Sequence, residues 1–146
     1  MHNLAKVIAS IESSNNPRAL RFEPAVFRDI TSRALIDPIE NEIMSLHECD
    51  HDTASVIYST SFGLFQIMGF NIWGDLDYNK TFFDFVSDET AQYNMFEKFL
   101  TENQIAFDLS DLLNNKDNLD RFSTVYNGSV SYGVSIVETA KIMGLV

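Results

Sequence analysis

IESSNNPRALRFEPAVF, residues 11–27, joins two helical patterns and so decides how the chain begins to fold. Before it, apolar residues recur at positions 4, 7, 8 and 11, which predicts an amphipathic helix over residues 3–13. The polar run that ends at Pro17 cannot continue this helix, because proline lacks the amide donor that the ladder needs. Pro24 is a favoured first helical residue, so a second helix should begin there with Glu23 at its N-cap.

The two glutamates of this stretch are expected to differ in acidity. Glu12 ends the first helix on its apolar side, where burial and the negative end of the helix dipole both disfavour a carboxylate and should raise its pKa. Glu23 caps a helix and follows Arg21 closely, so it should stay ionised. Two carboxyl groups with opposite tendencies suit glycoside hydrolysis, which needs one acid and one anion. Spacing alone leaves open that both are ordinary helix-end residues.

The rest of the chain reads as mainly α-helical. Residues 69–77 resemble a loop, the region around residues 14–22 allows a short β-hairpin between the first two helices, and nothing suggests more than one domain over residues 1–146. Ser59, Thr60 and Ser61 are expected to cap a helix whose apolar positions run from Leu64 to Met68. The remaining helices are expected over residues 38–48, 88–102, 117–126 and 132–143.

Composition narrows the class of protein. The net charge of −11 argues against binding to nucleic acid or anionic membranes. A single cysteine, Cys49, excludes an internal disulfide, and residues 4–11 are too short an apolar run for a membrane span or a secretion signal. Four of the ten basic residues lie in the stretch from Arg18 to Arg33. They could form a local positive strip on the acidic surface, or they could simply lie on a solvated helix face.

The string HECDH, residues 47–51, matches the H-E-x-x-H pattern of zinc proteases. That chemistry requires both histidines on one helix face, an apolar setting and a third ligand further along the chain. Asp50 and Asp52 flank His51, and no histidine follows it. We therefore expect His47, Glu48 and His51 to be partly exposed and metal-free; adventitious metal binding by His47, Cys49 and His51 is the alternative.

Three separated motifs carry a resemblance to a known family. They are IESSNNPRALRFEPAVF, the segment YSTSFGLFQIMGFN at residues 58–71, and YNG at residues 126–128. Their order is similar to that of goose-type lysozymes and soluble lytic transglycosylases, and LRFEPAVF with STSFGLFQIMGFN more closely resembles the N-acetylmuramidase domain of bacteriophage endolysins. The resemblance spans most of the chain and implies a lysozyme-like fold.

The resemblance also implies roles for individual residues. Glu12 matches the general acid and Glu23 the second acid, as base or stabiliser. Ala25 stands where relatives usually carry histidine, and the short segment between the two acids leaves open whether they are spaced for an inverting reaction, about 6.5–9.5 Å, or a retaining one, about 5.5 Å. Phe62 and Trp73 are expected in the core rather than on a sugar face. The residues expected to contact the glycan are Ser61, Gln66, Tyr126 and Asn127, of which Tyr126 and Asn127 match the pair that approaches the acid and the substrate N-acetyl group.

The implied activity is hydrolysis of the β-1,4 bond between N-acetylmuramic acid and N-acetylglucosamine in peptidoglycan, without metal or other cofactor. A lytic transglycosylase forming a 1,6-anhydro product and a non-cutting glycan-binding protein remain alternatives. The expected partner is the glycan strand, with the protein acting as a monomer. An endolysin would accumulate in the cytoplasm of the host bacterium before lysis; a secreted antibacterial effector is the alternative.

Overall fold

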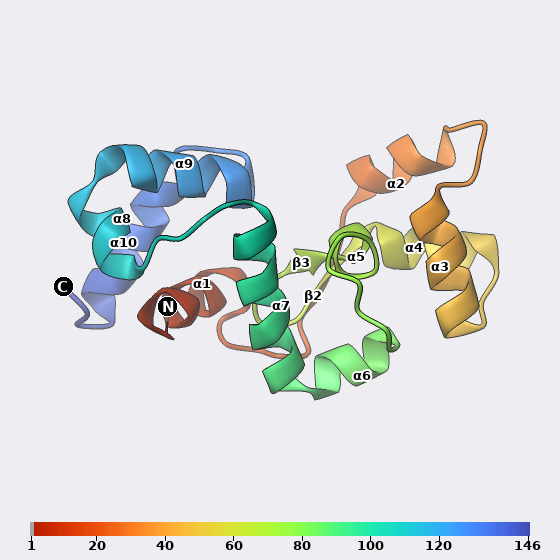
Figure 1. Cartoon of the computed structure of the whole chain (residues 1–146), viewed down its shortest axis with the longest axis horizontal. Helices are drawn as coiled ribbons and strands as arrows, with labels where there is room; N and C mark the ends of the chain where they lie inside the picture. The colour runs from red at the N-terminus through yellow and green to blue at the C-terminus, as the bar shows by residue number, and fades with distance from the viewer. Residues whose placement is uncertain (1) are drawn as a thin grey trace.

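The computed structural model describes residues 2–146 and is mainly helical, with one small antiparallel sheet (Figure 1). In chain order the elements are α1 (His2–Ser13), β1 (Leu20–Phe22), α2 (Pro24–Thr31), α3 (Pro38–His47), α4 (His51–Tyr58), β2 (Thr60–Phe62), β3 (Ile67–Met68), α5 (Gly69–Ile72), α6 (Phe82–Ser87), α7 (Glu89–Glu102), α8 (Leu109–Asn114), α9 (Lys116–Asn127) and α10 (Tyr132–Ile142).

The elements gather into two groups with the sheet between them. Figure 1 shows α1, α8, α9 and α10 at one end of the molecule and α2, α3 and α4 at the other, while α7 lies beside the sheet. Buried apolar residues from both groups belong to a single cluster, which runs from Leu4 in α1 through Phe65 to Ile43 in α3. The two ends of the molecule therefore share one core.

Helix α1 forms where the apolar spacing predicts it. Leu4, Val7 and Ile8 are fully buried and pack in the core. After Ser13 two successive residues, Ser14 and Asn15, are left-handed, and the amide of Asn15 donates to the carbonyl of Ala9 at 3.0 Å, which closes the helix end. This turn points the chain toward β1, and α2 then begins at Pro24 as predicted.

The sheet differs from the predicted hairpin around residues 14–22. That region supplies only the edge strand β1, which pairs with β2 so that Arg21 faces Ser61, and β2 pairs in turn with β3. The hairpin itself is β2–β3. Its turn contains Gly63 with φ of 77° and Gln66 with φ of 47°, both left-handed.

The helix predicted over Leu64 to Met68 is therefore wrong, and Ser59, Thr60 and Ser61 do not cap one. Every residue of β2 is buried, so this strand shows neither the alternation of a half-buried strand nor a polar helix face. A short run that is buried on all sides cannot be assigned to helix or strand by periodicity alone.

The predicted helices near residues 38, 88, 117 and 132 are confirmed as α3, α7, α9 and α10. Three helices were not expected: α4, α6 and α8, each of eight residues or fewer. The predicted loop over residues 69–77 also contains the single turn α5. Across residues 2–146, no helix combines the length and the apolar character that crossing a membrane would require.

Candidate active site

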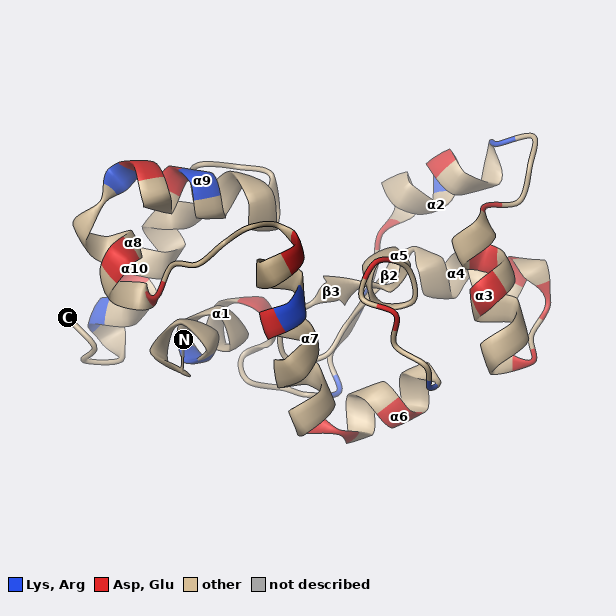
Figure 2. Cartoon of the chain, in the orientation of Figure 1, with Lys and Arg blue, Asp and Glu red and all other residues tan. Residues whose placement is uncertain are grey.

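A cleft of about 480 Å³ lies where the C-terminal ends of α1, α7 and α9 face the β2–β3 turn and α5. In Figure 2 the ends of α1 and α7 and the loop beside α5 are acidic. The ionisable and amide side chains that line the cleft are Glu12, Arg21, Gln66, Asn71, Asp75, Glu102, Asn103, Tyr126 and Asn127. The cleft thus combines several carboxyl groups with groups able to hydrogen-bond sugar hydroxyls and acetamides.

Glu12 is the partly buried carboxyl group of this cleft. Burial raises its pKa above the usual 4.5, and this effect outweighs the opposing effects of a hydrogen bond from Tyr132 and the positive charge of Arg21. The direction and its main cause agree with the expectation from sequence. A carboxyl group that keeps its proton to higher pH, at the wall of a cleft, is suited to act as a general acid.

Tyr132, rather than Tyr126, contacts this acid. The Tyr132 hydroxyl donates to Oε1 of Glu12 at 2.6 Å, and burial together with the Glu12 charge raises the pKa of Tyr132, so it stays a donor. Tyr132 is the first residue of α10, where the predicted helix over residues 132–143 begins, and it is buried. The hydrogen bond of Tyr132 could not be predicted from nearby residues, because its partner Glu12 lies 120 residues away in the chain.

Tyr126 lines the cleft, but its hydroxyl does not bond Glu12. It donates to the carbonyl of Phe65 at 2.6 Å, while its ring stacks on Phe122 with centroids 5.4 Å apart and lies 6.0 Å from that of Tyr132. Tyr126 therefore ties α9 to the β2–β3 turn. Asn127, the last residue of α9, is exposed at the cleft, where its amide can meet a ligand.

The side chain of Gln66 forms hydrogen bonds to neighbouring segments and so stabilises the cleft wall. Both amide hydrogens are used, since Nε2 donates to the carbonyls of Ala19 at 3.1 Å and Gly63 at 3.0 Å. Its Oε1 accepts from the Ser61 hydroxyl at 2.9 Å. The expectation that Ser61 contacts substrate is corrected by the structure, because Ser61 is fully buried in the central strand.

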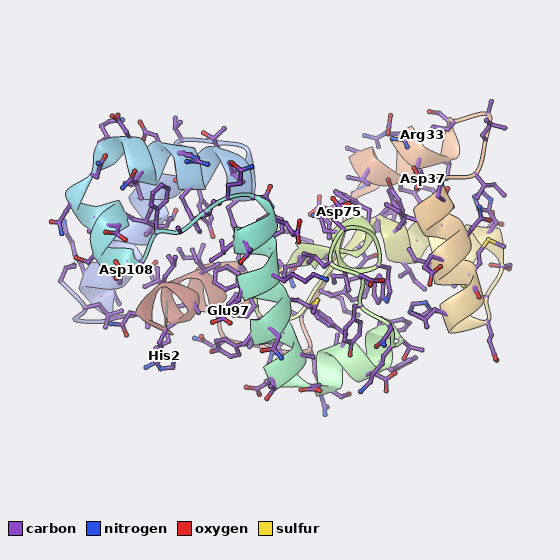
Figure 3. All side chains as sticks on the ribbon, in the orientation of Figure 1. His2, Arg33, Asp37, Asp75, Glu97 and Asp108 are labelled. Atoms are coloured by element: carbon purple, nitrogen blue, oxygen red, sulfur yellow. The ribbon has the colours of Figure 1, made fainter. Side chains whose placement is uncertain are left out.

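Glu23 does not line the cleft, although Arg21 does. The Arg21 Nε donates to Oε1 of Glu23 at 2.7 Å, and Glu23 occupies the N-cap of α2 without a side-chain capping bond. Two carboxyl groups that the site prediction did not include, Asp75 and Glu102, lie on the cleft wall instead. Figure 3 shows Asp75 in the loop beside α5. Phe62 and Trp73 are both 3% exposed and belong to the core, as expected.

The HECDH string spans two helices. His47 is the last residue of α3, Glu48 is left-handed with φ of 51°, and His51 begins α4, so the histidines do not share a helix face. His47 Nε2 accepts the amide of Phe82 at 3.0 Å, which leaves Nδ1 protonated toward the Ile43 carbonyl. His47 and His51 are partly exposed, as expected. Within residues 2–146, no three His, Cys, Asp or Glu side chains converge as metal ligands.

Comparison with known proteins points to one family. Residues 44–135 match the family model for N-acetylmuramidase, a range that includes Gln66, Tyr126, Asn127 and Tyr132. An endolysin from Enterobacteria phage PRD1 is 33% identical over 146 residues, which cover 99% of this chain and 98% of the relative, so that similarity also takes in Glu12, Arg21 and Glu23. No solved structure matches the chain.

Proposed function

This chain belongs to the N-acetylmuramidase family of glycoside hydrolases that act on peptidoglycan, and we propose that Glu12 is the general acid of its reaction. The observation that carries the proposal is the position of Glu12: a partly buried carboxyl group with a raised pKa, on the wall of an open cleft. The bond that it would protonate is the β-1,4 linkage between N-acetylmuramic acid and N-acetylglucosamine.

The proton would pass from Glu12 to the glycosidic oxygen as the bond to the leaving sugar breaks. Glu12 then carries a negative charge, which the Tyr132 hydroxyl and the Arg21 charge both favour. The same neighbours that make the acid easier to ionise thus support it after it has given up its proton. Burial favours the protonated form beforehand and so opposes the effect of these two neighbours.

For the second carboxylate we favour a group that faces the cleft. Hydrolysis needs an anion to activate water or to stabilise the positive charge on the sugar, and Asp75 and Glu102 line the same space as Glu12. Glu23 fits a role in positioning Arg21 better than that of base or stabiliser, because its Oε1 accepts from Arg21 and the residue lies off the cleft wall. The presence of further cleft carboxylates favours hydrolysis over the transglycosylase reaction, in which the N-acetyl group replaces water.

Glu12→Gln is the decisive substitution, assayed on purified peptidoglycan. The amide keeps the shape and can still accept from Tyr132 but has no proton to give, so we expect a loss of about 10²- to 10⁴-fold in rate with the melting temperature retained. Glu42→Gln makes the same chemical change on the exposed face of α3 and should leave the rate unchanged. Substantial activity in Glu12→Gln would refute its assignment as the acid.

Two further measurements separate the finer alternatives. Glu23→Gln retains an oxygen that can accept from Arg21, so it should keep most activity if Glu23 positions Arg21 and lose it if Glu23 is the base. Mass spectrometry of the digest should show reducing muramic acid ends; 1,6-anhydromuramic ends would identify a transglycosylase. Wild-type protein that binds the glycan without cutting it would support the non-catalytic alternative.

The biological setting that we propose is cell lysis by a bacteriophage. The support is the similarity to an endolysin over nearly the whole chain. In this setting the enzyme accumulates in the host cytoplasm and reaches the wall once the membrane has been permeabilised. Bacteria that express the chain should therefore lyse on chemical permeabilisation of the cytoplasmic membrane, and cells expressing Glu12→Gln should not.

A further inference from the structure

Arg21 is the one basic residue that lines the cleft in the part of the chain the structure describes. It shares this wall with the carboxyl groups of Glu12, Asp75 and Glu102, in a protein whose net charge is −11. An anionic ligand that entered such a cleft would meet repulsion everywhere except near Arg21. A single cation in these surroundings therefore determines where a negative group can lie.

Among the described residues, one of the three guanidinium nitrogens of Arg21, Nε, has a hydrogen-bond partner, and the two terminal nitrogens remain available to a ligand. Nε donates to Glu23, whereas among residues 2–146 neither terminal nitrogen has a hydrogen-bond or ion-pair partner. The side chain is 57% exposed, so a ligand can reach it. A guanidinium that retains two free donors in one plane matches the two oxygens of a carboxylate.

The backbone beneath Arg21 is also fixed. Arg21 pairs with Ser61 in the sheet, and the Ser61 hydroxyl, whose single proton goes mainly to Gln66 Oε1 at 2.9 Å, also lies 3.3 Å from the Arg21 carbonyl as the weaker branch of a shared bond. The guanidinium is thus anchored from the sheet and from Glu23 before any ligand arrives. Such preorganisation lowers the entropy cost of binding.

We propose that Arg21 binds a carboxylate of the substrate and so determines specificity for muramic acid strands over neutral glycans. This inference rests on the proposed function, because the carboxylate belongs to the glycan that Glu12 would cleave. Muramic acid carries a lactyl ether whose carboxyl group is free in strands without peptide stems. In strands with stems that group is an amide, and the available carboxylates are those of the peptide. Both sources offer the same chemistry to Arg21.

The test compares three forms of one glycan: stem-free strands with free lactyl carboxylates, the same strands with these groups converted to neutral methylamides, and strands with intact stems. The measurement is kcat/KM on each form at one pH, expressed relative to the methylamide form. Because Arg21 also affects the pKa of Glu12, its removal changes all absolute rates, but this effect is common to the three substrates and cancels in the ratios.

Arg21→Gln should lower one of the two ratios about tenfold, the change expected from losing a charge-assisted bond of roughly 1.4 kcal/mol. A lower ratio on stem-free strands assigns the lactyl carboxylate, and a lower ratio on stem-bearing strands assigns the peptide. Arg18→Gln, which removes an equal charge from an exposed residue away from the cleft, should change neither ratio.

Unchanged ratios in Arg21→Gln would overturn the proposal and leave Arg21 acting only through the charge of Glu12. Should Arg21→Gln fail to fold, Arg21→Lys is judged by the same ratios, since it retains the charge and loses the paired donors. Failure of the proposed function is a distinct result: Glu12→Gln would then cleave all three substrates, whatever Arg21 does.

Discussion

Three effects act on the pKa of Glu12, one raising it and two lowering it. Burial favours the protonated form, while the Tyr132 hydroxyl and the Arg21 charge favour the carboxylate. Tyr132 and Arg21 belong to α10 and β1, whereas Glu12 belongs to α1. The balance is set where residues from α1, β1 and α10 meet, so substitutions at Tyr132 or Arg21 should change the pH dependence of activity without altering the acid itself.

Tyr132→Phe removes the hydrogen bond that favours ionised Glu12. The pKa of Glu12 should therefore rise further, and because the proposed general acid would work in its protonated form, the alkaline limb of the profile of kcat/KM against pH should shift to higher pH. Tyr126→Phe is the matched control, since it deletes a hydroxyl that bonds Phe65 and not Glu12. A shift to lower pH, or equal shifts in both variants, would contradict the assigned role of Tyr132.

For single residues, the sequence predicts those properties that depend on residues close by in the chain. The raised pKa of Glu12 follows from its place at the apolar end of a helix, and the proximity of Arg21 to Glu23 follows from their spacing. The contact of Glu12 with Tyr132 does not, and neither does the presence of Asp75 at the cleft. The first depends on how α10 packs against α1 and the second on how α5 packs against the sheet, which no local pattern encodes.

Helix α7 is connected to three other segments by the hydrogen bonds of Gln92. This side chain is fully buried and satisfied: Oε1 accepts the amide of Leu64 at 2.7 Å, and Nε2 donates to the carbonyls of Pro17 at 3.0 Å and Phe85 at 2.9 Å. A single amide thereby connects α7 to the turn after α1, the β2–β3 turn and the end of α6. The Gly63 backbone approaches so closely that a Cβ there would lie 2.4 Å from Gln92 Oε1.

Gln92→Leu should destabilise the protein by about 2 kcal/mol or more, because the buried Leu64 amide loses its acceptor and the carbonyls of Pro17 and Phe85 each lose a donor. The measurement is the free energy of unfolding from a urea titration followed by circular dichroism. Asn94→Leu makes a comparable amide-to-leucine change at an exposed position of α7 and should have little effect. A loss below about 0.5 kcal/mol would show that the connection contributes little to stability.

The elements that the sequence predicts well are those with one buried face. Helices α1, α7 and α10 each present apolar residues at helical spacing, and all three were located within a residue or two. Strand β2 escaped prediction because it is buried throughout and pairs with β1, 40 positions earlier in the chain. Pairing between distant segments decided its structure, rather than propensity.

The whole molecule carries twice as many acidic as basic residues, 21 against 10. Few of the acids are neutralised locally, since the ion pairs of the described residues involve only Glu23, Asp29, Asp37, Glu40 and Asp120. Figure 2 shows acidic residues spread over α3, α6, α7 and α8. Repulsion among them opposes the compact state.

Salt should therefore stabilise this protein. Raising NaCl from about 10 mM to 150 mM shortens the screening length from roughly 30 Å to 8 Å and weakens repulsion between distant acids more than attraction within close pairs. We expect the melting temperature at pH 7 to rise, with a much smaller change near the pI of about 4.4, where the net charge approaches zero. A fall in melting temperature with salt would mean that the ion pairs outweigh the repulsion.

Helix α1 packs against α10, and the catalytic candidate at the end of the former is bonded to the first residue of the latter. This arrangement has a consequence for synthesis on the ribosome. Glu12 leaves the exit tunnel 120 residues ahead of Tyr132, so it has no hydroxyl partner until the segment around Tyr132 has also emerged. A nascent chain therefore displays its glutamate long before it possesses the assembled acid.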